Sequence, residues 1–176
     1  MTEYVILVSE ADEALGRMEK MEAHQKGALH RAFSVFLFNE HGETLLQQRA
    51  AEKYHSPLLW TNTCCSHPRE GETVLEAAQR RVSEELGIQP AAIRDLDVAF
   101  HFTYRAEFDN GLIEHELDHV LIGHFEGDCV LNTEEVASVR WVAMEDLMAD
   151  VKAAPENYTA WFKIILDEYV KHLPSL

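Results

Sequence analysis

The segment richest in potential chemistry is 61–68 (TNTCCSHP), which holds two adjacent cysteines and a histidine. Cys65 and His67 are two residues apart, so on a strand both side chains would face one side and Cys64 would face the other. An exposed thiol near cationic groups or a metal has a lowered pKa and can transfer protons or act as a nucleophile. The alternative interpretation of this segment is a small buried thiol beside a hydrogen-bonded histidine.

Carboxylates and other side chains alternate along 114–119 (EHELDH). On a strand, Glu114, Glu116 and Asp118 would share one face. Like charges on one face repel each other unless a cation lies between them or one carboxyl group is protonated. The apolar residues that follow (VLI) favour a strand that enters the core and carries its carboxylates into a pocket, over an exposed edge strand.

His24 and His30 precede the first long apolar run, and His67 could supply a third imidazole nitrogen. Neutral imidazoles bind borderline metals well, so the three histidines are candidate metal ligands. Because the chain has ten histidines, such a pair can also arise by chance. We interpret His41, His55 and His172 as surface residues.

A helix is predicted over 72–86, with Gly87 as its C-cap. The apolar positions that predict it are Leu75, Ala78, Val82 and Leu86. Arg81, Glu84 and Glu85 would lie together on one side of this helix. They would form either an ordinary ion pair on a solvated face, or a carboxylate that reaches Mg²⁺ with an arginine that grips phosphate beside it.

These residues must be positioned by a mixture of strands and helices. Strands are predicted at 4–8, 32–38, 44–48, 59–64, 98–105, 114–125 and 136–142, with turns at 39–42 (NEHG) and 109–111 (DNG). Two further helices are predicted near 145–152 and 158–172. Because the order is not a strict βαβ alternation, we expect a single α+β domain, a mixed sheet flanked by helices, rather than a doubly wound fold.

Composition restricts the partners and the location of the protein. Apolar residues make up 47% of the 176 residues, yet no run of about 18 apolar residues exists that could span a membrane. Three cysteines and an N-terminus without secretory features predict a reducing, cytoplasmic compartment. The formal net charge of −16 argues against nucleic acid and anionic membranes as partners. The oligomeric state is open, with a monomer favoured.

Charge is uneven along the chain. Residues 1–105 hold 11 of the 15 Lys and Arg residues against 16 acidic residues, and residues 106–176 hold 4 against 15. A small anionic substrate could therefore be held where the N-terminal cations converge.

The segment 72–88 resembles the Nudix box, G-x5-E-x7-R-E-U-x-E-E-x-G-U, with two departures. The opening glycine falls on Ser66, and the first of the three late glutamates falls on Arg81. A Nudix hydrolase uses that glutamate to hold divalent ions. An arginine there removes a ligand and adds a phosphate-binding cation, which argues against nucleotide hydrolysis.

With TNTCCSHP ahead of it, the same region is similar to the type 1 isopentenyl-diphosphate delta-isomerase family. The resemblance covers most of the chain, through 19–24 (EKMEAH), 29–34 (LHRAFS), 61–68, 80–87, 102–105 (FTYR), 114–116 (EHE) and Trp161. It implies a Nudix-like fold with an N-terminal extension (1–30) that supplies metal ligands, a core of about 31–152 and a C-terminal helix of about 158–172. The implied activity interconverts isopentenyl and dimethylallyl diphosphate through a tertiary carbocation.

The resemblance also implies roles for individual residues. Cys65 and Glu116 match the acid–base pair, Tyr104 matches the tyrosine that hydrogen-bonds the glutamate, and Trp161 matches the aromatic residue that faces the reacting carbons. The implied ligands of one divalent metal (Mn²⁺, Zn²⁺ or Mg²⁺) are His24, His30, His67, Glu114 and Glu116. Glu85 matches the residue that reaches a second, substrate-bound Mg²⁺. The implied diphosphate contacts are Lys20, Arg49, Lys53 and Arg81.

Two other functions compete with this interpretation. One is a Nudix diphosphate hydrolase, against which Arg81 and Cys65 argue. The other is a non-catalytic module in which Cys65, His24, His30 and His67 hold structural zinc. That module would leave Glu114, Glu116 and Arg81 without a purpose.

Overall fold

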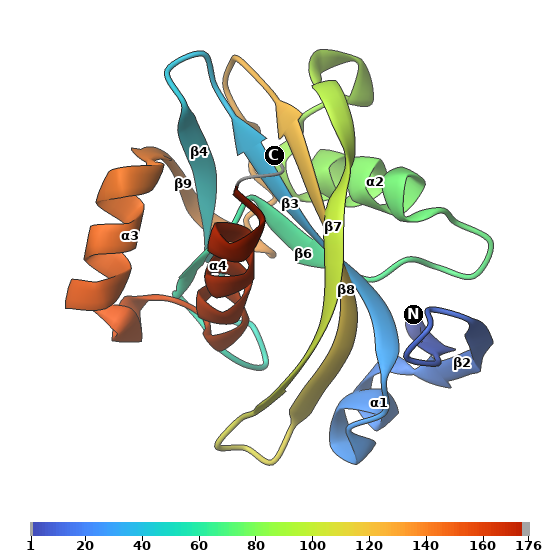
Figure 1. Ribbon diagram of the computed structural model, residues 1–176. Coiled ribbons are helices and arrows are strands. Elements are labelled where there is room, and N and C mark those ends of the chain that lie inside the picture. Colours follow the sequence, from blue (N-terminus) through green and yellow to red (C-terminus); the bar gives the residue numbers. More distant parts are fainter. Residues whose placement is uncertain (1, 174–176) are drawn as a thin grey trace.

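The computed structural model describes residues 2–173, which form one mixed nine-stranded sheet with helices on both faces (Figure 1). The strands are β1 (Tyr4–Val8), β2 (Ala14–Glu19), β3 (His30–Phe38), β4 (Glu43–Arg49), β5 (Trp60–Thr61), β6 (Cys64–Ser66), β7 (Arg94–Glu107), β8 (Ile113–His124) and β9 (Val136–Ala143). The helices are α1 (Lys20–Lys26), α2 (Val74–Leu86), α3 (Met144–Ala153) and α4 (Ala160–His172), with 3-10 turns at Pro90–Ala92 and Pro155–Asn157. The predicted α+β class with a mixed sheet is confirmed.

Strand β3 lies at the centre of the sheet, and nearly all of its side chains are buried. It pairs antiparallel with β1, β4 and β6, and parallel with β8. The parallel register starts with His30 opposite Glu116 and ends with Phe38 opposite His124. β8 is also paired with β7, and β4 with β9. Strand β3 therefore brings β6 and β8 to its two edges.

Each face of β3 contributes to a different apolar core, because side chains alternate along a strand. On one face Phe33 and Val35 belong to a cluster that includes Val82 of α2. On the other face Phe36 belongs to a cluster that includes Phe162 of α4. Figure 1 shows α2 and α4 on opposite sides of the sheet. Helices α2 and α4 thus pack against side chains on the two opposite faces of one central strand.

The structure differs from the predicted elements in three places. Strand β2 and helix α1 were not expected, because α1 has only seven residues; the Glu19 side chain caps it by accepting from two backbone N–H groups. The strand expected at 59–64 is broken into β5 and β6. Asn62 lies at the break, and its side-chain amide donates to the carbonyls of Val35 and Cys64. The predicted helix begins at Val74, because Thr73 is its N-cap in a capping box. No helix within residues 2–173 is long and apolar enough to cross a membrane.

Gly87, the predicted C-cap of α2, has a φ of 66° and allows a stability test of this helix end. A Cβ at this position would lie 2.7 Å from the carbonyl oxygen of Val130. Gly87→Ala is therefore expected to lower the free energy of unfolding by about 2–4 kcal/mol, from backbone strain plus overpacking. The control is Gly42→Ala, which has a similar φ of 74° but no atom within 4 Å of the added Cβ. It should cost about 1 kcal/mol in denaturant unfolding. Equal losses would show that the contact with Val130 does not matter.

Candidate active site

One cavity of about 70 Å³ gathers most of the residues singled out in the sequence. A larger hollow of about 540 Å³ adjoins it, since both are lined by Lys20, Lys53, Ser66, His67, Arg81 and Glu135. The predicted site residues that line the cavity are Lys20, Arg49, Lys53, Cys65, His67, Arg81, Glu85, Tyr104, Glu114, Glu116 and Trp161. The two predicted residues that do not line it are His24 and His30, and both are buried and near the ring of His67.

Three histidines converge on the buried carboxylate of Glu116. The ligand atoms of His24, His30, His67 and Glu116 all lie within 4.8 Å of one another, and we call these four residues the His/Glu cluster. The Nε2 atoms of His30 and His67 lie 3.1 and 2.9 Å from the same oxygen of Glu116. Burial opposes the charged form of Glu116, but His67 and His30 outweigh it and hold the pKa of this carboxyl group well below its usual value.

The His/Glu cluster fits a divalent metal. The Nδ1 atoms of His24 and His30 lie 2.7 and 2.8 Å from the carbonyl oxygens of Lys20 and Ala28. Because a carbonyl only accepts, each Nδ1 carries the proton, and each Nε2 is left for coordination, as in known metal sites. The Nε2 atom of His24 is buried and has no hydrogen-bond partner within residues 2–173. Mixed nitrogen and oxygen ligands suit Zn²⁺, Mn²⁺ or Mg²⁺.

Tyr104 connects the two glutamates of β8. Its hydroxyl oxygen lies 2.7 Å from Glu116 and 2.9 Å from Glu114, so its single proton can be donated to one of them at a time. Burial, followed by the nearby charge of Glu116, raises the pKa of Glu114 well above its usual value. Glu114 is not among the four close ligand atoms of the His/Glu cluster. Its predicted place as a fifth metal ligand stays a prediction.

Cys65 reaches the cavity from β6, and Cys64 points to the other face of the sheet. Cys64 is fully buried in the cluster beneath α2, whereas Cys65 packs against the cluster beneath α4. The thiol of Cys65 donates to Asn62 Oδ1 at 2.9 Å, and Ser34 Oγ lies 3.4 Å from its sulfur. The expectation of a lowered thiol pKa is wrong, because burial, followed by the charge of Asp118, raises the pKa of Cys65 well above its usual value.

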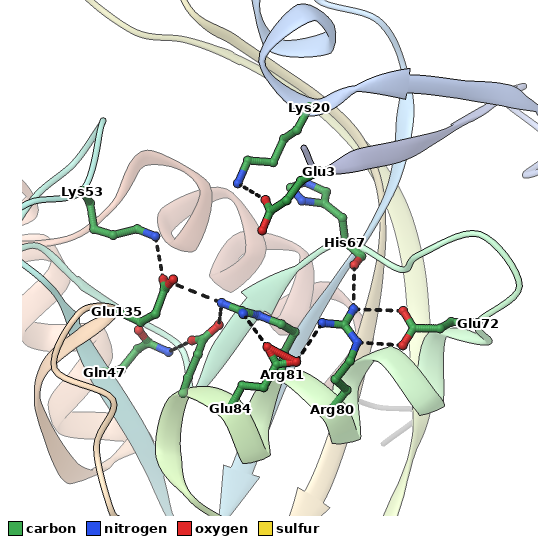
Figure 2. Close-up of polar contacts among 11 residues, drawn as sticks. Glu3, Lys20, Gln47, Lys53, His67, Glu72, Arg80, Arg81, Glu84 and Glu135 are labelled. Atoms are coloured by element: carbon green, nitrogen blue, oxygen red, sulfur yellow. Dashed lines mark hydrogen bonds and ion pairs between the residues drawn. The ribbon is translucent and has the colours of Figure 1, made fainter. Parts of the chain in front are cut away.

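The four cations predicted to bind diphosphate, Lys20, Arg49, Lys53 and Arg81, all line the cavity, and we call them the cation cluster. Figure 2 shows three of them paired with carboxylates. Lys20 binds Glu3 and Lys53 binds Glu135, at 2.7 and 2.6 Å. Arg81 binds Glu85 at 2.6 Å and Glu84 at 3.0 Å. The Arg49 guanidinium instead lies 5.0 Å from the centre of the Trp161 ring.

Arg81 and Glu85 form the polar side of α2, but this side is not simply solvated. Glu85 is only 4% exposed, and its two oxygens accept from Gln47 at 2.9 Å and from Arg81 at 2.6 Å. The ion pair therefore faces the cavity, which contradicts the alternative of an ordinary exposed helical pair.

Trp161 occupies the first turn of α4, where it is both a core residue and part of the cavity wall. It is 2% exposed and belongs to the core beneath this helix, and it also lines the cavity. Its ring stands edge-on to those of His55 and Phe108. The cavity therefore has an aromatic wall as well as charged ones.

His55 was expected at the surface, and this prediction is wrong. It is 6% exposed, stacks on Phe108 and lines the cavity. Its segment has no periodicity that would predict burial, and the loop turns inward through Ser56 and Leu58, which have φ values of 52° and 61°. The cavity also contains Gln47, Tyr54 and Glu135, which carry no motif and were not predicted, and Thr61 and Ser66, which belong to TNTCCSHP but were given no role in the site.

Comparison with known proteins agrees with this geometry. The NUDIX domain family model matches residues 28–162. A relative named isopentenyl-diphosphate Delta-isomerase, from Photobacterium profundum, is 51% identical over 98% of this chain and 97% of its own length. Isopentenyl-diphosphate Delta-isomerase 2 from Aromatoleum aromaticum is 49% identical over 97% of this chain and 88% of its own.

Solved structures share the fold. The crystal structure of DR0079 from Deinococcus radiodurans has a TM-score of 0.70 at 21% identity and covers 86% of this chain and 90% of its own. The MutT protein from Methanosarcina mazei has a TM-score of 0.65 at 20% identity, over 82% of this chain and 94% of its own. From the family model and the two relatives it follows that the chain belongs to the family of Nudix-domain isopentenyl-diphosphate Delta-isomerases.

Proposed function

We propose that this chain interconverts isopentenyl and dimethylallyl diphosphate by adding a proton at one carbon and removing another two bonds away. One observation carries the proposal: a single cavity holds a thiol from β6, a carboxylate from β8, an indole from α4 and the cation cluster. A reaction that passes through a tertiary carbocation needs an acid and a base on opposite sides of an apolar fragment from which water is excluded.

The cation cluster binds the diphosphate end of the substrate. Lysine and arginine donors form strong, charge-assisted contacts with phosphate oxygens. Because Lys20, Lys53 and Arg81 are already paired with carboxylates, the substrate takes over donors whose positions are fixed. This holds the hydrocarbon end in one orientation beside the acid–base residues.

Cys65 and Glu116 carry out the two proton transfers. They lie on different strands, β6 and β8, at opposite edges of β3. Tyr104 hydrogen-bonds Glu116 and orients its carboxylate. The indole face of Trp161 stabilises the carbocation, by about 2 kcal/mol or more where water is absent. Neither proton-transfer residue can replace the other, because each serves one face of the substrate.

Two divalent ions complete the site. The residues that would hold one are His24, His30, His67 and Glu116, with Glu114 as the proposed fifth ligand; the N-terminal extension (1–30) supplies two of them. Glu85, beside Arg81, would hold a Mg²⁺ bound to the substrate. Bound ions supply neutralisation of the diphosphate charge and a fixed geometry for the carboxylates.

A Nudix hydrolase is the competing function, and the polar side of α2 argues against it. In the Nudix box the position of Arg81 is a metal-binding glutamate. Here Arg81 donates to one oxygen of Glu84 and to one oxygen of Glu85. A cation in that place disfavours the several metal ions that hydrolysis requires and favours binding of phosphate.

A cytoplasmic location and a monomeric state complete the proposal. Cys64, Cys65 and Cys129 are all free thiols, as suits a reducing compartment. The substrate is a small diphosphate, and neither nucleic acid nor a membrane is a proposed partner.

The decisive assay is incubation of the protein with isopentenyl diphosphate and Mg²⁺, followed by proton NMR. We expect dimethylallyl diphosphate as the product, with deuterium in its methyl groups when the reaction runs in heavy water. Released phosphate would instead indicate a hydrolase, and the absence of any reaction would refute both functions.

The neighbouring cysteines provide a matched pair of variants. Cys65→Ala and Glu116→Gln should each lose at least about 100-fold in kcat, the contribution of an acid or base in the right place. Cys64→Ala should keep the wild-type rate, because its thiol faces the α2 core. Circular dichroism checks that all three variants fold. An inactive Cys64→Ala beside an active Cys65→Ala would reverse the assignment.

Loss of one imidazole should weaken the metal site. After treatment with a chelator, calorimetric titration with Mn²⁺ should show more than about 10-fold weaker binding to His67→Ala than to wild type. His41→Ala removes an exposed histidine outside the cavity and is the control. Equal Mn²⁺ affinity of His67→Ala and wild type would remove His67 from the metal site.

A further inference from the structure

Asp118 is a buried carboxyl group that neither the fold nor the proposed proton transfers require. It is 1% exposed, and within residues 2–173 no lysine, arginine or histidine forms an ion pair with it. Oδ2 accepts one hydrogen bond, from Ser34 Oγ at 2.7 Å. Oδ1 has no hydrogen-bond partner among the described residues. Burying such a group costs stability, so its presence points to another role.

Among residues 2–173, the only hydrogen-bond partner of the Asp118 side chain is Ser34, which lies next to Cys65. Antiparallel pairing of β3 with β6 places Ser34 opposite Cys65, and Ser34 Oγ lies 3.4 Å from Sγ. Ser34 is itself 2% exposed. Asn62 Oδ1 also lies near the sulfur, at 2.9 Å, and the Asn62 amide is fixed by the two backbone carbonyls to which it donates. The single thiol hydrogen thus has two oxygen acceptors within reach.

We propose that Asp118 is a positioning residue that acts through Ser34 to hold the thiol of Cys65 against the substrate. Asp118 accepts the hydrogen bond of the Ser34 hydroxyl and thereby fixes the rotamer of this side chain, so that the Ser34 oxygen stays beside Cys65 as an acceptor for its thiol. Without Asp118 the Ser34 hydroxyl would rotate, and the Cys65 thiol would lose one of the two acceptors beside it. This inference rests on the proposed function of Cys65.

Unfolding temperature and activity together distinguish this positioning role of Asp118 from a structural role. Asp118→Leu removes a carboxyl group that is buried without a cation, but it also leaves the buried Ser34 hydroxyl without its acceptor, so the two effects on stability oppose each other. Asp118→Leu should therefore unfold at a temperature close to that of wild type while it loses activity. Because Asp118 is outside both the His/Glu cluster and the cation cluster, its Mn²⁺ affinity and its KM should match those of wild type.

The test compares kcat, KM and unfolding temperature in three single variants. Asp118→Leu should lose about 10- to 100-fold in kcat, as expected for a misplaced catalytic group. Asp118→Asn keeps an acceptor for the Ser34 hydroxyl and should recover most of the rate lost in Asp118→Leu. Thr44→Val is the matched control, because Thr44 is a buried hydroxyl on β4 that donates to Leu37 O outside the cavity. It should lose stability but keep the wild-type kcat.

A double variant tests whether Asp118 acts through Ser34. Ser34→Ala should lower kcat by itself, and adding Asp118→Leu should cause little further loss, because both changes remove the same support. Multiplicative losses would overturn the proposal, as would an unchanged kcat or an altered KM in Asp118→Leu. A wild-type protein that does not convert isopentenyl diphosphate would refute the proposed function. An active wild type together with a fully active Asp118→Leu would refute only the inference about Asp118.

Discussion

The buried carboxylate of Glu116 contacts His30, His67 and Tyr104. The strands around Glu116 must be arranged so that these three side chains reach it. A charged group at 6% exposure must be compensated by close partners. Its partners come from β3, from the residue after β6 and from β7, so three strands have to meet β8 at one place. The parallel register of β3 and β8, which sets His30 opposite Glu116, makes this meeting possible.

Because side chains alternate along β3 and β6, one face of these strands packs in the apolar core and the other face carries residues of the site. Phe33, Val35 and Cys64 face α2 and bury apolar surface, whereas Cys65 lines the cavity and Ser34 contacts its sulfur. A shift in register by one residue would exchange these two sets. The same core that holds α2 in place therefore also fixes which cysteine is available for proton transfer.

Electrostatics divides the cavity into two ends. At one end three of the four cations are paired with carboxylates, which lowers the cost of keeping them together before an anion arrives. At the other end burial dominates, and it raises the pKa of Cys65, Glu114 and Tyr104. A molecule with a diphosphate head and a short apolar tail matches this division, in a chain whose net charge of −16 would repel large anions.

Local patterns in the sequence were enough to identify TNTCCSHP, EHELDH and the helix that carries Arg81 and Glu85, because periodicity and resemblance both act over short stretches of chain. They also predicted correctly that Cys64 and Cys65 face opposite sides. Only the tertiary structure decided the burial of His55, the break at Asn62 and the contact of Asp118 with Ser34. The last two residues are 84 positions apart and meet because β3 and β8 pair in parallel. The physical reason is that hydrogen bonds between strands depend on register, which no short segment encodes by itself.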